Sequence, residues 1–368
     1  MRTLLAQRTS LGGLFVLGVT CALVPILVLC CWLMAHQWLA YRSASEAVRG
    51  FDTFRATLLA MEVVSAERGP TNGALGEEVP IPPARLAALA LARQRSDAQI
   101  ATLLGKLREE PSPARAENVE VVMKFRADLA SARANVDQLV GEPLLWRGDQ
   151  TTQNAVNRMI ALIPELLPPV IVEMSVVNKG DPAVAETMLV AKLTADLREQ
   201  AGQLGSRFTS ALAMHRPLTS EEQLAIARTS GRIDQLRALI DLRMLDHPAL
   251  TAEALATMTW RYFGDGQRYV AEVREMASRP DGADISTGAF AEHYVPTMRS
   301  ITQLRDVLLT EAEDKLRRHQ RMALIELAGA TAAVVQLLCT LACMTLVFRR
   351  AVSRTWRQSD IVARVDSD

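Results

Sequence analysis

The stretch LGGLFVLGVTCALVPILVLCCWLM, from Leu11 to Met34, decides the fold because its 24 residues include no charge. At about 1.5 Å rise per residue it would form roughly 36 Å of helix, enough to cross a hydrocarbon core of about 30 Å. A secretory signal peptide has an apolar core of only about 7–15 residues, so we predict an uncleaved membrane anchor. Trp38 and Tyr41 follow it as an aromatic belt at the far interface.

A second apolar run, Leu327 to Phe348, ends in Arg349 and Arg350. Two spans place both termini on one side of the membrane and everything between them on the other. The predicted organisation is a tail of residues 1–10, a transmembrane helix over 11–34, a large domain over 35–321, a transmembrane helix over 322–348 and a tail over 349–368.

The orientation of the chain is predicted from its charges. Long translocated domains largely escape the positive-inside rule whereas short tails obey it, so we expect cytoplasmic tails and an extracytoplasmic domain. The chain carries 41 Lys+Arg and 41 Asp+Glu, of which 34 basic and 37 acidic residues lie in 35–321. This neutral balance argues against nucleic-acid binding. The inverted topology, with the domain in the cytoplasm, stays open as an alternative.

The domain between the spans is predicted to be helical throughout. It is rich in Ala, Leu, Arg, Glu and Gln, and prolines divide it about every thirty residues. Eight segments of bundle-helix length result, which predicts an all-α fold in which two transmembrane helices flank an elongated domain of two stacked four-helix bundles. The segment Met159–Val177 is apolar enough for a third span, but Pro164, Pro168 and Pro169 favour a kinked, buried bundle helix.

Local capping signals mark several of the predicted helix starts. Ser112 and Asp181 each stand directly before a proline, which suits an N-cap followed by a first-turn proline. Thr219 and Glu222 have the spacing of a capping box. We therefore expect helices to begin at these three places. All five cysteines lie in the two spans, so the domain has no disulfide framework and depends on its own core.

One segment resembles a known family. The sequence MEVVSAERGPTNGALG, residues 61–76, resembles the E-R-G-x-[ST] signature of nitrate/nitrite-sensing and related all-helical sensor domains, and DLREQAGQLGSR, residues 196–207, resembles their second half. Such domains occur in bacterial chemoreceptors, histidine kinases and membrane-bound diguanylate cyclases. The resemblance implies a periplasmic sensor in the bacterial inner membrane, with a ligand held between helices and arginines supplying the site of a small anion.

The chain departs from that pattern at two points. Pro70 follows Glu67-Arg68-Gly69 and is expected to break or bend the helix there. Only 20 residues follow the second span, so we expect the signal to pass to a missing output domain or a separate cytoplasmic partner. Gly329 and Ala333 have small-xxx-small spacing, which favours packing of the spans in a homodimer.

Five residues are candidates for ligand binding, and each has a structural alternative. Arg68 has the guanidinium fork that matches nitrate or a carboxylate, but it would equally suit the last turn of a helix that ends at Gly69. Thr71 and Asn72 could donate to a ligand or cap a turn. Gln203 and Arg207 share a face that would complete the site if it met the first helix, or would be a solvated polar stripe otherwise.

Catalytic and metal-binding motifs are absent from the sequence, and we predict no enzyme activity, cofactor or metal. The five histidines are scattered without i, i+4 pairs, and no P-loop, dinucleotide fingerprint or nucleophile elbow is present. Two functions remain. The first is a receptor whose domain binds a small ligand and displaces one terminal helix relative to the other. The alternative is a scaffolding membrane protein whose bundle docks a protein partner and binds no small molecule.

Overall fold

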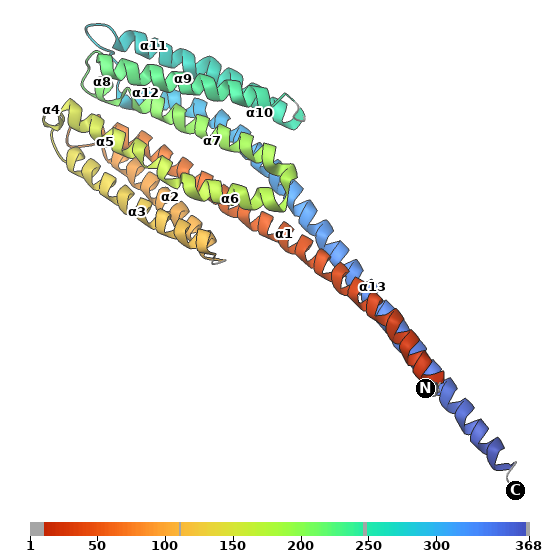
Figure 1. Cartoon of the computed structure of the whole chain (residues 1–368). Coiled ribbons are helices and arrows are strands. Elements are labelled where there is room, and N and C mark those ends of the chain that lie inside the picture. The colour runs from red at the N-terminus through yellow and green to blue at the C-terminus, as the bar shows by residue number, and fades with distance from the viewer. Residues whose placement is uncertain (1–10, 110–111, 246–248, 366–368) are drawn as a thin grey trace, which may run out of the picture. The chain divides into compact units, whose positions relative to one another are not determined.

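The computed structural model describes residues 11–109, 112–245 and 249–365, and every regular element in them is helical. The all-α prediction is confirmed for this part of the chain. The predicted first tail, residues 1–10, lies outside it. The elements in chain order are α1 Leu11–Leu75, α2 Pro83–Glu109, α3 Pro113–Val140, α4 Leu144–Arg147, α5 Asp149–Ala161, the 3₁₀ turn η1 Ile163–Leu166, α6 Leu167–Gly180, η2 Pro182–Val184, α7 Ala185–Ser206, α8 Thr209–Ala213, α9 Ser220–Arg243, α10 Ala249–Met258, the π-helix η3 Thr259–Gly266, α11 Gln267–Ala277, α12 Thr287–Tyr294, η4 Val295–Met298 and α13 Arg299–Val365 (Figure 1).

The chain divides into two compact units. One comprises the two ends of the chain, up to Ser45 and from Arg318 onward, and the other comprises Glu46–Arg317. In the first unit, large apolar side chains are exposed, including Leu29 at 63% and Val347 at 65%. Three helices are long and apolar enough to cross a membrane, within Leu23–Leu75, Gln150–Gly180 and Thr287–Arg350. The apolar window of the middle one is 44% buried, whereas those of the outer two are not buried at all.

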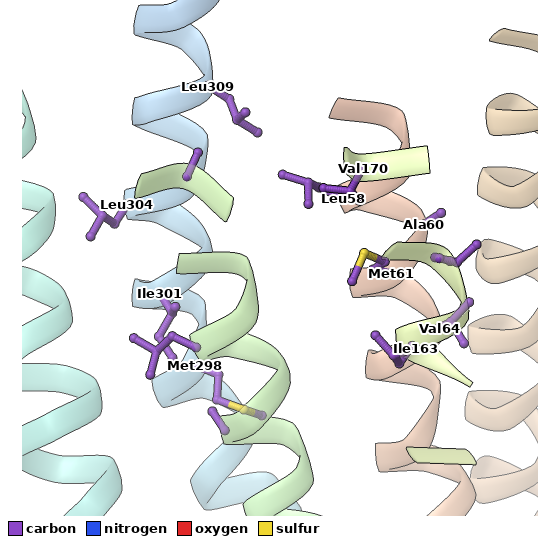
Figure 2. Close-up of a cluster of buried hydrophobic side chains, with 14 of the residues drawn as sticks. Leu58, Ala60, Met61, Val64, Ile163, Val170, Met298, Ile301, Leu304 and Leu309 are labelled. Atoms are coloured by element: carbon purple, nitrogen blue, oxygen red, sulfur yellow. The ribbon is translucent and has the colours of Figure 1, made fainter. Parts of the chain in front are cut away.

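The second unit has a large apolar core and a small separate cluster formed by Leu75, Val136, Leu139, Ala155, Val156 and Ile160. Within the unit α2 packs on α3, α3 on α5 and α6, α6 on α7, and α7 on α9 (Figure 1). Figure 2 shows how α1 and α13 contribute to the large core together with η1, α6 and η4. Ten of the buried side chains are labelled there: Leu58, Ala60, Met61, Val64, Ile163, Val170, Met298, Ile301, Leu304 and Leu309.

The predicted helix starts are confirmed. Ser112 accepts a hydrogen bond from the amide of Arg115, and Asp181 accepts one from the amide of Ala183. Thr219 and Glu222 form the reciprocal capping box. The prolines also interrupt Met159–Val177 as expected, because α5 ends at Ala161 and a 3₁₀ turn precedes α6.

The prediction that Pro70 breaks the first helix is wrong. Helix α1 runs without interruption from Leu11 to Leu75 and therefore passes through Gly69-Pro70. Part of the steric penalty before a proline comes from the Cβ of the preceding residue, and Gly69 has none. The remaining cost, about 3 kcal/mol for a proline inside a helix, is offset by the burial of α1 on both sides of it, at Val64 and at Leu75.

Arg147 joins the C-terminal ends of two helices, α1 and α3, which Gly76 and Gly141 follow in the sequence. Its side chain is 1% exposed. It donates hydrogen bonds to the carbonyls of Ala74 and Leu75 at the end of α1, and to those of Val140 and Glu142 after α3. These carbonyls belong to the last helical turns, whose acceptors have no partner within the helix. One guanidinium therefore fastens the ends of α1 and α3 together.

Replacing Arg147 with alanine is expected to lower the free energy of unfolding by about 2 kcal/mol, because several buried carbonyls lose a charged donor. Hydrogen exchange should show the loss first at the ends of α1 and α3. The exposed Arg126 on α3 is the matched control, and Arg126→Ala should change neither quantity. If the backbone amide of Leu75 exchanged its hydrogen at the same rate in the wild type and in Arg147→Ala, the capping role would be contradicted.

Candidate functional site

A cavity of about 410 Å³ lies in the second unit, lined by α1, α7, α12 and the beginning of α2. Helix α1 presents Ser65, Arg68 and Asn72 to it, and α7 presents Arg198 and Gly202. Two buried arginines from different helices therefore meet at one cavity. This arrangement places one of the five predicted ligand-binding residues, Arg68, at the centre of the site.

Arg68 is held by a carboxylate from α7. Only 1% exposed, it donates from Nη1 to Glu199 Oε1 at 2.7 Å and from Nη2 to Glu199 Oε2 at 2.9 Å. Gln203 donates to Glu199 Oε1 at 2.9 Å. Burial acts to raise the pKa of Glu199, but the charge of Arg68 and hydrogen bonds from Arg68, Ser65 and Gln203 outweigh it, so the pKa lies below its usual range. The pair thus persists at neutral pH and is lost only on acidification below that range.

Arg198 has no such carboxylate. It is 7% exposed and donates from Nη1 to Ser65 Oγ at 2.8 Å, and Ser65 Oγ also accepts from Arg68 Nη2 at 2.7 Å. Among the described residues Arg198 forms no ion pair within 4.0 Å. Burial lowers its pKa; Glu199 opposes this shift, and the neighbouring Arg68 adds to it. The nearby Glu62 and Arg305 pair with each other. Arg305 also pairs with Asp306 at 2.7 Å, so the charges of this region balance overall. Arg198 therefore lacks a carboxylate in direct contact, and Glu199 and Glu62 act on its charge only at longer range.

Gly202 allows the two guanidinium groups to approach each other. A Cβ atom at this position would lie 2.8 Å from Arg198 Nη1 and 2.9 Å from Arg68 Nη2. A side chain would therefore displace both groups, so glycine is required for the guanidinium groups to pack this closely against α7. The arrangement of charge and space is suited to an anion, because a guanidinium binds oxyanions through parallel hydrogen bonds.

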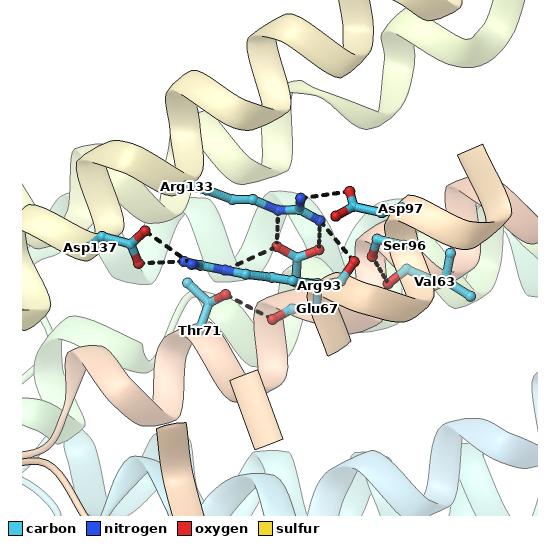
Figure 3. A network of polar contacts seen from close by, with 8 residues as sticks. All are labelled: Val63, Glu67, Thr71, Arg93, Ser96, Asp97, Arg133 and Asp137. Atoms are coloured by element: carbon cyan, nitrogen blue, oxygen red, sulfur yellow. Dashed lines mark hydrogen bonds and ion pairs between the residues drawn. The ribbon is translucent and has the colours of Figure 1, made fainter. Parts of the chain in front are cut away.

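Glu67, the neighbour of Arg68 in the E-R-G motif, faces a different side of α1. Its carboxylate is fully buried and accepts two hydrogen bonds of 2.7 Å from Arg133 of α3 (Figure 3). Arg93 of α2 lies 3.9 Å away and also binds Asp137, while Arg133 binds Asp97. Consecutive helical residues point about 100° apart, so Glu67 joins α1 to α2 and α3 while Arg68 joins it to α7.

The other predicted site residues lie in different surroundings. Asn72 lines the cavity and donates to Ser206 Oγ at 3.1 Å. Gln203 is buried behind the cavity wall, against Glu199. Thr71 donates to the carbonyl of Glu67 in its own helix, and Arg207 donates to Asn157 Oδ1 at 2.7 Å without lining the cavity.

Sequence reasoning did not identify three residues that shape the site. Arg207 was expected to face α1, but Arg198 faces it instead. Glu199 binds Arg68, and Ser65 binds both Arg68 and Arg198. One signal was available: Gly202 and Gly205 are spaced by one turn on α7, and small residues at helical spacing allow close approach of a neighbouring helix. Which of the arginines meets α1 depends on the rotation of α7, which local sequence does not specify.

These features define an all-α chain with an arginine-lined cavity between helices. No protein-family model matches the chain, and a search of curated proteins gives no match. Among solved structures the chain is similar to the structure of the NasR transcription antiterminator, with a TM-score of 0.58 and 15% sequence identity over 84% of this chain and 83% of that one. At this identity the similarity shows the helical fold alone.

Proposed function

We propose that this chain is a signal-transduction receptor of the bacterial inner membrane whose helical domain binds a small anion in the cavity beside Arg68 and Arg198. The observation that carries the proposal is that the buried Arg198 guanidinium has no carboxylate in direct contact among the described residues. A buried ion without a counter-ion costs several kcal/mol, and folding tolerates such groups mainly where a ligand uses them. The cavity beside this charge is open to a ligand and contains the hydrogen-bond donors that an anion requires.

The membrane topology is part of the proposal. The apolar windows at the two ends of the chain contain no buried residues, whereas nearly half of the middle one is buried within its own domain. This difference favours two spans, 11–34 and 322–348, with the domain in the periplasm and both termini in the cytoplasm. We propose further that the domain is built as two stacked four-helix bundles and that the receptor is a homodimer.

Signalling would use the two helices that both units share. Helix α1 carries Arg68 and also the first apolar run, and α13 carries the second. An anion that draws Arg198 and Arg68 together alters the packing of α7 on α1, and we propose that the resulting displacement of α1 relative to α13 reaches a cytoplasmic output domain or partner.

The test is anion binding by the full chain in lipid nanodiscs, measured by isothermal titration and thermal unfolding. Nitrate, nitrite and acetate are the probes, each added to a low-salt buffer. At one hundred times its Kd, an anion should stabilise the wild type by about 2.7 kcal/mol. Arg198→Gln should abolish the effect, while Arg228→Gln, at an exposed arginine of α9, should retain it.

The alternative, a scaffold that binds no small molecule, predicts a different outcome. In that case none of the anions would stabilise the wild type, and Arg198→Gln would behave like Arg228→Gln. Stabilisation that survives in Arg198→Gln would place the anion elsewhere and would equally contradict the proposed site.

A further inference from the structure

The cavity is much larger than an inorganic anion needs. Its volume is about 410 Å³. One water-sized probe takes about 10–15 Å³ of such a volume, so a four-atom anion would fill on the order of one eighth of it. Cavities of roughly 300–1,000 Å³ are typical of sites for organic ligands. Nitrate would leave most of the cavity unfilled, so the volume indicates a larger ligand.

The polar and apolar parts of the cavity are separated along α7. At Gly202 the nearest side chains are the two guanidinium groups. At Gly205, about 4.5 Å further along the helix axis, a Cβ atom would lie 3.0 Å from Tyr294 Cε1 and 3.5 Å from Phe290 Cε1. One turn of α7 thus leads from a cationic end to an aromatic wall.

The aromatic wall presents ring carbon atoms to the cavity, and its hydroxyl group is hydrogen-bonded within the protein. The Tyr294 hydroxyl donates to the carbonyl of Ala201 at 2.9 Å and lies 3.2 Å from the Tyr262 hydroxyl, which in turn accepts from Gln267. Its hydrogen-bonding capacity is therefore used within the protein. Phe290 stacks on Tyr294 with ring centroids 5.4 Å apart, which fixes both rings. Leu212, Val295 and Met298 extend the same apolar lining.

We propose that the ligand is an organic monocarboxylate with an apolar, preferably aromatic, group. Its carboxylate binds Arg198 and Arg68 at the Gly202 end, and its apolar group packs against Phe290 and Tyr294. The carboxylate supplies the direct anionic contact that Arg198 lacks within the protein, and its planar shape matches the guanidinium fork. This inference rests on the proposed anion-binding function and adds the chemical class of the ligand.

The experiment compares acids of increasing size on the full chain in nanodiscs by isothermal titration, with empty nanodiscs as blanks. The probes are acetate, phenylacetate, 3-phenylpropionate and 4-phenylbutyrate, together with nitrate and the neutral amides of the three phenyl acids. We expect the phenyl acids to bind more tightly than acetate or nitrate, by about fourfold for each methylene that becomes buried. The amides should bind at least tenfold more weakly than their acids.

A variant of the apolar end separates the two parts of the cavity. Ala291→Phe fills space beside the aromatic wall, so it should remove the advantage of the phenyl acids and leave acetate binding unchanged. Ala289→Phe, at an exposed position on the same helix α12, is the matched control and should bind like the wild type.

Failure of the inference and failure of the proposed function give different results. If nitrate and acetate bind as tightly as the phenyl acids, the organic ligand is excluded and the anion receptor stands. If the amides bind as tightly as the acids, or if nothing binds, the anion site itself is refuted. Phenyl acids that bind equally well to Ala291→Phe would overturn the assignment of the apolar end.

Discussion

Glu67→Gln is expected to unfold at a temperature lower by on the order of 5–10 °C than the wild type, which corresponds to a loss of about 3 kcal/mol. The Glu67 carboxylate is fully buried and accepts both hydrogen bonds from Arg133 (Figure 3). A neutral amide leaves Arg133 and Arg93 without the anion that they enclose, and it turns one accepting oxygen into a donor. Thermal unfolding of the full chain in detergent, followed by the helical circular dichroism signal, measures the effect.

The same network supplies the control. Asp137 binds Arg93 at 2.7 Å, but its side chain is 55% exposed, so water replaces the lost contact. Asp137→Asn should therefore change the unfolding free energy by less than about 1 kcal/mol. Equal losses for Glu67→Gln and Asp137→Asn would show that burial of the carboxylate does not determine the strength of this network.

The two arginines of the cavity are expected to respond to substitution with opposite signs. Arg198→Met removes a buried charge that has no carboxylate in direct contact, and we expect the ligand-free protein to become more stable by about 1–2 kcal/mol. Arg68→Met removes the partner of Glu199 and should lower stability by about 2 kcal/mol, because a buried carboxylate loses two charged donors. Both variants should lose anion binding.

Thermal unfolding in a low-salt buffer without added carboxylate measures this difference. Arg228→Met, at an exposed position on α9, should unfold like the wild type. Destabilisation by Arg198→Met would mean that the guanidinium is compensated within the folded chain, and the argument for an anion at this site would then fail.

Much of the fold could be predicted from the sequence because its signals are local. A proline ends a helix because it lacks the amide hydrogen and its ring clashes with the preceding turn. The caps at Ser112, Asp181 and Thr219 depend on side chains that bond backbone amides no more than three residues further along the chain. These rules place most of the long helices, but several of the eight predicted segments are divided further, so that the described residues form thirteen α-helices. At Pro70 the local rule fails, since the burial of α1 against the rest of the domain outweighs the cost of the proline.

The candidate site could be predicted only in part, because it depends on contacts between distant segments. Arg68 and Asn72 were found from a motif and do line the cavity. Helical spacing correctly indicates that Arg198 and Arg207 point in different directions, but the rotation of α7 on α1 decides which of them meets Arg68. Likewise, the pairing of Glu67 with Arg133 joins residues 66 positions apart. No local pattern encodes such a pair.

The central claim is that Arg198 and Arg68 form an anion site, and bromide tests it most directly. Crystals of the full chain grown in sodium bromide would reveal bound bromide by its anomalous scattering. The account predicts an ordered bromide in the cavity, within hydrogen-bonding reach of the Arg198 guanidinium, that disappears in Arg198→Gln. An empty cavity at saturating bromide, with ordered bromide only at other arginines, would contradict it.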